Sequence, residues 1–170
     1  MDEDLPSGPR VIVGVDESPA ARWALAWAIG AARLRRMALV AVHVSRAPIH
    51  PFSETLPVNH AARLDEQDRS SDLVAQAFEE VAGGVPDDLR LTVATRLGEP
   101  GYHLVQLARE IDLLVLGRSR RSLLSRMLLP STSMYCARHA EATVVLVRLP
   151  VSPTEEQLAT ERSRRLWWTE

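Results

Sequence analysis

The residues best suited to bind a charged ligand lie between positions 117 and 133. Four arginines crowd the first part of this segment, and a cationic cluster can receive an anion such as a phosphate: Arg118, Arg120, Arg121 and Arg126. The segment ends in Ser131, Thr132 and Ser133, which are predicted to open a helix, one of them as its N-cap. A helix N-terminus favours negative charge, so the same hydroxyls are candidates for phosphate contact. The alternative interpretation is a solvated arginine loop without a ligand.

Asp16 is a second candidate because it directly follows the apolar run from Val11 to Val15. It precedes Ser18-Pro19, the sequence of a helix N-cap followed by proline at the first helical position. A carboxylate at this place stabilises the start of a helix through its dipole. It can also contact a ligand, and both roles remain open.

Other kinds of chemistry find little support in the residue types. All 20 basic residues are arginine, which excludes a Schiff-base lysine and a phosphate-binding lysine. Cys136 is the only cysteine and carries no signature of a nucleophile. The histidines show no metal-binding spacing, and we expect no metal: His43, His50, His60, His103 and His139. His43 is expected to be a satisfied core histidine. Because no catalytic constellation is recognisable, we lean against an enzyme.

Strand and helix patterns alternate along the chain. The strands are predicted at residues 11–15, 39–44, 89–97, 113–116 and 143–147, and the helices at 19–36, 60–82, from 100 and at 131–138. This order predicts an α/β fold with a doubly wound parallel sheet and helices on both faces. Ligands of such folds bind at the carboxyl ends of the strands. Val15 and Val44 end the first two runs and are therefore expected to line the site.

Length and composition indicate one domain over residues 1–150, followed by a polar tail at 151–170. The formal net charge of −2 does not favour nucleic acid, and neither a membrane span nor a signal peptide is recognisable, so we expect a cytoplasmic protein. Ser152-Pro153 could start a helix in the tail. Trp23 and Trp27 are expected to pack between elements, and Trp167-Trp168 to dock on the domain or on a second protomer.

Three segments resemble the universal stress protein family. They are VIVGVDESPAARWALAWA, GEPGYHLVQLAREIDLLVLG and the stretch from Gly117 to Val147, so that the resemblance covers roughly residues 9 to 149. It implies a five-stranded sheet of order 3-2-1-4-5. ATP-binding members carry a loop of the form G-x2-G-x9-G-S/T, in which glycines let the backbone approach phosphates. Asp16, Gly117 and Ser131 match the family's acidic residue, first glycine and final hydroxyl, whereas Arg120 and Pro130 replace its second and third glycines.

The resemblance implies three functional alternatives. The leading one is a cytoplasmic stress-response protein that acts by binding a protein partner rather than by turnover, with ATP binding affected by Arg120 and Pro130. Proline has no N–H to donate, whereas the Arg120 guanidinium could contact phosphate. The others are an ATP-binding module or weak ATPase that uses the altered loop, and a scaffold that uses the arginine loop or the tryptophan tail. The resemblance also implies a homodimer through the last strand, Thr143 to Val147.

Overall fold

The computed structural model describes residues 5–46, 60–118 and 131–150, with residues 60–66 described by their backbone alone. Within these ranges strands and helices alternate as the sequence predicts. In order they are β1 (Arg10–Gly14), α1 (Pro19–Arg35), β2 (Ala38–Ser45), α2 (His60–Ala82), β3 (Leu91–Leu97), α3 (Pro100–Leu107), β4 (Leu113–Arg118), α4 (Thr132–His139) and β5 (Thr143–Arg148). The predicted polar tail, its two tryptophans, Arg120, Arg121, Arg126 and Pro130 lie outside the described residues.

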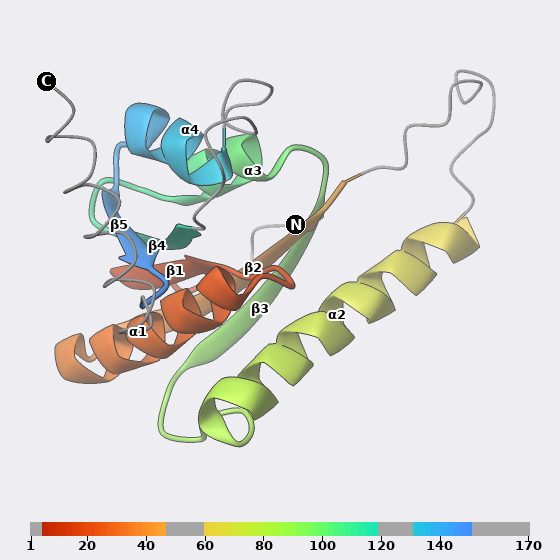
Figure 1. Ribbon diagram of the computed structural model, residues 1–170, viewed down its shortest axis with the longest axis horizontal. Coiled ribbons are helices and arrows are strands. Elements are labelled where there is room, and N and C mark those ends of the chain that lie inside the picture. Colours follow the sequence, from red (N-terminus) through yellow and green to blue (C-terminus); the bar gives the residue numbers. More distant parts are fainter. Residues whose placement is uncertain (1–4, 47–59, 119–130, 151–170) are drawn as a thin grey trace, which may run out of the picture.

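The five strands form one parallel sheet in the order β3-β2-β1-β4-β5. Helices α1 and α2 cover one face, and α3 and α4 cover the other (Figure 1). The predicted fold class and strand order are therefore confirmed. Strand β3 begins at Leu91, two residues after the predicted Leu89, and it is a half-covered edge strand as expected. None of the described helices is both long enough and apolar enough to span a bilayer.

Helix α1 begins as the sequence predicts. The Ser18 hydroxyl accepts a hydrogen bond from the backbone N–H of Ala21 at 3.2 Å, and Pro19 is the first helical residue. The prediction that Trp23 and Trp27 pack between elements is wrong, since their side chains are 49% and 41% exposed. Alanines supply much of the buried face of this helix, and small side chains let its backbone lie close to the sheet.

The alternation of side chains along each strand divides the core into two layers. On β2, Leu39 and Ala41 pack with α1 and α2, whereas Val40 and Val42 pack with α3. Phe78 of α2 is the largest fully buried side chain, so aliphatic residues fill the rest of the core. The same alternation directs His43 to the α1/α2 face and Val44 to the α3/α4 face at the carboxyl end of β2.

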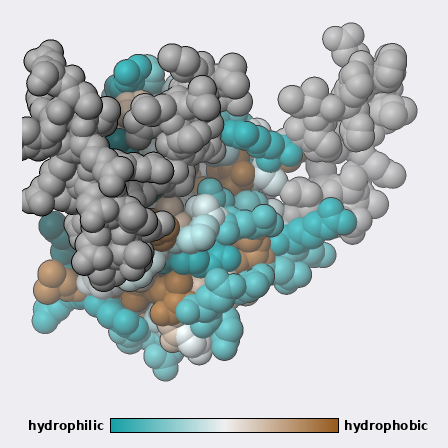
Figure 2. Space-filling view, viewed as in Figure 1, coloured by the Kyte–Doolittle hydropathy of each residue, from teal (hydrophilic) through white to brown (hydrophobic). Residues whose placement is uncertain are grey.

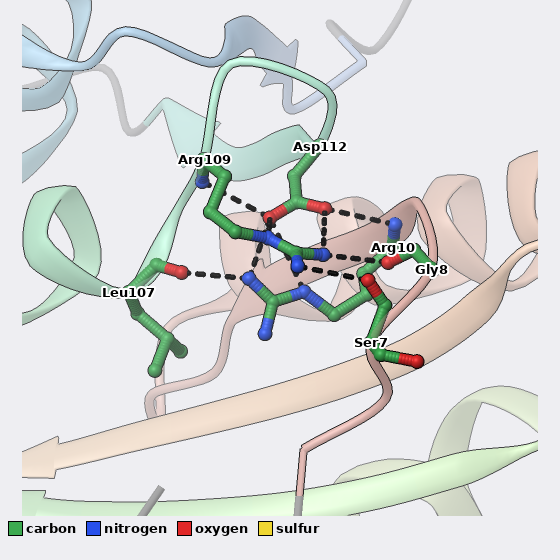
Figure 3. A network of polar contacts seen from close by, with 6 residues as sticks. All are labelled: Ser7, Gly8, Arg10, Leu107, Arg109 and Asp112. Atoms are coloured by element: carbon green, nitrogen blue, oxygen red, sulfur yellow. Dashed lines mark hydrogen bonds and ion pairs between the residues drawn. The ribbon is translucent and has the colours of Figure 1, made fainter.

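A buried polar network joins the amino ends of β1 and β4 (Figure 3). The carboxylate of Asp112 accepts hydrogen bonds from the backbone and side chain of Arg10 and from Arg109. Arg109 also donates to the carbonyl oxygens of Ser7 and Gly8, at 2.9 and 2.6 Å. The network thereby fixes the chain that leads into β1. It lies at the edge of the sheet opposite the carboxyl ends of the strands.

Candidate ligand site at the carboxyl ends of the strands

A hollow of about 290 Å³ lies at the carboxyl edge of the sheet, on the α3/α4 face. Six of the nine predicted site residues line it: Val15, Asp16, Val44, Gly117, Thr132 and Ser133. Val42, Leu104 and Leu116 add apolar walls. Strand order reverses here, because the chain runs from β1 outward to β2 and β3 and then returns to β4 and β5 on the other side. Doubly wound proteins bind ligands at this point.

Asp16 is exposed at the rim of the hollow and also prepares the start of α1. Its Oδ1 atom accepts a hydrogen bond of 2.8 Å from the backbone N–H of Ser18. Among the described residues Oδ2 has no hydrogen-bond partner, so this oxygen is available to a ligand. The structural and ligand-binding roles left open by the sequence are therefore compatible.

The turn between β1 and α1 is held by contacts that sequence reasoning missed. The backbone N–H of Val15 donates to the Val42 carbonyl at 2.8 Å, and His43 Nδ1 donates to the Val15 carbonyl at 2.9 Å. Arg22 donates to the carbonyl of Asp16 at 2.7 Å. These bonds use the backbone groups on both sides of Asp16 and fix the position of its carboxylate. His43 is satisfied as expected, but it is half-buried beside a second hollow rather than enclosed in the core.

Three hydroxyl side chains lie at the start of α4, and their roles differ. Ser131 is the N-cap, and its Oγ atom accepts a hydrogen bond of 3.3 Å from the Met134 N–H. A contact of 3.2 Å joins the hydroxyls of Ser131 and Ser133. Thr132 and Ser133 line the hollow, whereas Ser131 does not. Ser131 is therefore the capping residue, and the two hydroxyls after it are placed for ligand contact.

Gly117 has a steric role that differs from the one implied by the resemblance. A Cβ atom at this position would lie 2.4 Å from the backbone carbon of Ala20 and 2.5 Å from its oxygen. Its φ angle is not positive, unlike those of Gly83, Gly84 and Gly98. The glycine is thus required for the close approach of α1 to β4, and phosphate contact is not needed to explain it.

Of the four loop arginines named from the sequence, the structure describes only Arg118. Arg118 is half-buried at the end of β4, where it pairs in register with Arg148 of β5, and it does not line the hollow. Its predicted place in the site is therefore not supported by its position. Arg46, which the sequence did not single out, does line the hollow. It follows the end of β2, so the rule that placed Val44 in the site could also have found it.

A second, wider hollow of about 790 Å³ adjoins the first, on the α1/α2 side of the same edge. Both hollows share Asp16, Ser18, Val44 and Arg46. Its remaining walls come largely from His43 and from the middle of α2, including Arg69, Asp72 and Gln76. Acidic and basic residues are equally frequent around it, so its charge favours neither anions nor cations. Over the described ranges, no three histidine, cysteine, aspartate or glutamate side chains gather as metal-ion ligands.

A parallel sheet of this order, with a hollow at its switch point, defines the class of doubly wound α/β proteins that bind ligands at the carboxyl edge. Within that class the chain belongs to the universal stress protein family, whose family model matches residues 9–148. The resemblance seen in the sequence is thereby confirmed.

Similar proteins agree with this assignment. A universal stress protein of Mycobacterium tuberculosis is 32% identical over 139 residues, which are 81% of this chain and 47% of that protein. The chain thus spans about half the length of the curated relatives it matches. The solved structure of the universal stress protein UspA from Lactobacillus plantarum has a TM-score of 0.61 at 24% identity, covering 85% of this chain and all of the other. A universal stress protein solved in complex with cAMP has a TM-score of 0.52 at 22% identity, covering 84% and 98% of the two chains.

Proposed function

We propose that this chain is a stress-response protein that binds an adenine nucleotide in the hollow on the α3/α4 face and acts by binding rather than by turnover. The observation that carries the proposal is the meeting of Asp16 with the first turn of α4 at one apolar-walled hollow. The cAMP bound in the solved structure of a related universal stress protein is of the same chemical class.

Each part of the hollow suits one part of a nucleotide. The side chains of Val42, Val44 and Leu104 offer an apolar surface to a base. The free oxygen of Asp16 can accept hydrogen bonds from ribose hydroxyls. Thr132 and Ser133 can donate to phosphate oxygens beside the positive end of the α4 dipole.

A binding role is supported by how the polar groups of the site are already used. Asp16 holds the Ser18 amide through one oxygen, and the Ser131 hydroxyl caps α4. These bonds hold the site in a fixed geometry, which favours stable recognition of a ligand. Arg120 and Pro130 replace glycines of the family's phosphate loop and lie outside the described residues. ATP, with its three phosphates, is therefore to be compared with the smaller nucleotides AMP and cAMP.

The test is calorimetric titration of the nucleotide-stripped chain with cAMP, AMP and ATP with Mg²⁺, alongside thermal unfolding. We expect saturable binding of at least one nucleotide and a rise in melting temperature. Asp16→Asn keeps an acceptor for the Ser18 amide but removes the charge, and Thr132→Val removes a hydroxyl. Each should weaken binding by about two- to tenfold, the range of one net hydrogen bond.

Thr143→Val is the matched control for Thr132→Val, because Thr143 is exposed at the start of β5 and does not line the hollow. It should leave the affinity unchanged. Absence of binding by all three nucleotides at millimolar concentration would reject the proposal. Release of phosphate from bound ATP would contradict the proposal that the chain acts without turnover, and would favour a weak ATPase instead.

We also propose that the chain forms a homodimer through β5. This strand is last in the sheet, its outer edge has no partner strand among the described residues, and its central side chains are only half-buried. Sedimentation should therefore give twice the 18.9 kDa of one chain. Hydrogen exchange of the β5 amides should slow as concentration rises, whereas β3, the other edge strand, should not change. A monomer at all concentrations would exclude the dimer.

A further inference from the structure

Helix α1 carries an exposed apolar stripe that the proposed function does not use. Trp23, Trp27 and Leu34 are 49%, 41% and 85% exposed. Their spacing of four and seven residues places them on one side of the helix. Gly30 lies between Trp27 and Leu34, and a Cβ atom placed there would point into open space. Figure 2 shows apolar surface among polar surface in the part of the molecule that carries α1.

The contacts of α1 with α2 and the loop after it fix the direction of this stripe. Arg22 pairs with Glu80 of α2, and Arg33 pairs with Asp88, so the side of α1 that bears these arginines faces α2. At about 100° per residue, Trp23 and Trp27 lie about 100 to 140° around the helix from Arg22, across its solvent-exposed side. The stripe therefore lies on the flank of α1 remote from α2.

That flank borders the outer part of the sheet, over β5. Strand β5 lies on the other side of β1 from β2 and β3. Val145 and Val147 of β5 pack partly against the core cluster of α1, but both stay half-buried. Helix α1 packs against β5 on this face, and no other described helix does. The α1 stripe and the half-buried side of β5 thus form an apolar surface that no further described element covers, of the kind that marks a docking site.

We propose that residues 151–170 of the same chain cover this surface as a helix beside α1. The described chain ends at Pro150, just after β5, at the carboxyl edge where α1 also begins. The segment therefore starts next to the surface. Its length fits: a helix over 153–170 would run about 27 Å, and the 17 residues of α1 run about 25 Å.

The sequence of the segment suits this position. Ser152-Pro153 has the form of a helix start, and Leu158 and Leu166, eight residues apart, fall toward the same side of a helix. Trp167 and Trp168 supply large apolar area near its end, which favours burial. The tryptophans of the segment would then pack near the exposed Trp23 and Trp27 of α1.

The four tryptophans of the chain make the test direct, since all belong to the two surfaces in question. Trp167→Phe with Trp168→Phe leaves Trp23 and Trp27 as the only reporters and keeps the segment apolar. Ending this variant chain after Pro150 should shift its emission to longer wavelength and increase quenching by acrylamide. Identical emission and quenching with and without the segment would overturn the proposal.

A second variant avoids truncation. In the full-length Phe variant, Leu158→Glu with Leu166→Glu should reproduce the shift, whereas Glu155→Gln should not. Protection must also be independent of protein concentration, because the segment and the stripe belong to one chain. Protection that appears only at high concentration would overturn the proposal in favour of a second copy as the occupant.

Discussion

Arg10 and Asp112 form an ion pair that is closed to solvent. Arg10 Nη2 lies 2.6 Å from Asp112 Oδ2, and the two side chains are only 5% and 0% exposed. The arginine also donates to the Leu107 carbonyl at 2.9 Å, so its buried charge has a second acceptor. The pair connects residues 102 positions apart in the sequence and joins the amino ends of two neighbouring strands.

Removing one member of this pair should be severely destabilising. Asp112→Asn leaves the Arg10 guanidinium buried without its counter-charge, which typically costs about 3–5 kcal/mol. We expect the free energy of unfolding in urea to fall by about that amount. Asp88→Asn is the control, because it breaks an ion pair with Arg33 whose side chains are about half exposed. It should lower the free energy of unfolding far less, because solvent screens an exposed pair. Equal losses in both variants would contradict the assigned role of Asp112.

The same pair predicts how stability depends on pH. Burial raises the pKa of the Asp112 carboxyl, but hydrogen bonds from Arg10 and Arg109 outweigh it and hold the pKa well below its ordinary range. Because the folded-state pKa is depressed, the stabilisation is complete above the unfolded pKa of about 3.9 and is lost as pH falls below it. Unfolding measured in urea from pH 5 down to pH 2 should therefore show a loss of stability that begins near pH 4 and steepens below it.

Asp112→Asn should flatten this pH dependence. Glu80 and Asp88 also have a lowered pKa, through hydrogen bonds from Arg22 and Arg33, and they contribute to the slope of the unchanged chain. The difference between the two slopes therefore isolates Asp112. Parallel curves for the variant and the unchanged chain would show that this carboxyl does not titrate as proposed.

The sequence predicts most of the fold because its local signals agree with one another. The Ser18-Pro19 start of α1 and the alternation of strand and helix patterns are all found in the structure. The buried Arg10–Asp112 pair could not be predicted this way, since each residue simply precedes an apolar run. The strand register explains it: Val11 pairs with Leu113, which places the two preceding residues side by side.

The candidate site was predictable in outline but not in its division of roles. The switch-point rule found Val15, Asp16 and Val44 from strand ends alone. The support that His43 gives to the turn before α1 depends on the pairing of β1 with β2, which no local pattern reveals. Periodicity predicts packing for Trp23 because it counts tryptophan as apolar, but the alanines of α1 already complete its buried face.

Because α1 lies so close to β4, adding a single methyl group at Gly117 should destabilise the fold. Gly117→Ala would place a Cβ atom 2.4 Å from the backbone of Ala20, so the start of α1 must move. Overpacking of this kind costs typically about 1–3 kcal/mol, and thermal or urea unfolding would measure it. Nucleotide affinity should fall as well, because the same turn of α1 positions Asp16 and Ser18 at the hollow.

Gly30→Ala is the matched control, and it should raise the free energy of unfolding rather than lower it. No side chain or backbone atom lies within 4 Å of a Cβ placed at Gly30, and the residue is inside α1. Alanine is the better helix former, so this variant should gain about 0.5–1 kcal/mol. Destabilisation by Gly30→Ala, or tolerance of Gly117→Ala, would contradict the packing described for α1.

Cys136 should be unreactive in the folded chain. Its side chain is fully buried in α4, and burial raises the pKa of the thiol to about 11. The thiolate is the reactive form, and at pH 8 only about one thiol in a thousand would be ionised, against roughly a quarter for an ordinary cysteine of pKa about 8.5. We expect a chromogenic disulfide reagent to modify no thiol in the native protein and one thiol per chain in urea.

The kinetics of this reaction distinguish a buried structural cysteine from a nucleophile. If Cys136 is structural, its modification must wait for the chain to open, so the rate should rise with urea concentration in step with unfolding. Because Cys136 is the only cysteine, the stoichiometry cannot be confused by a second thiol. Modification of the native protein as fast as of the unfolded chain would mean that the thiol is accessible and ionised. In that case α4 would have to be reconsidered as the carrier of a reactive group beside the hollow.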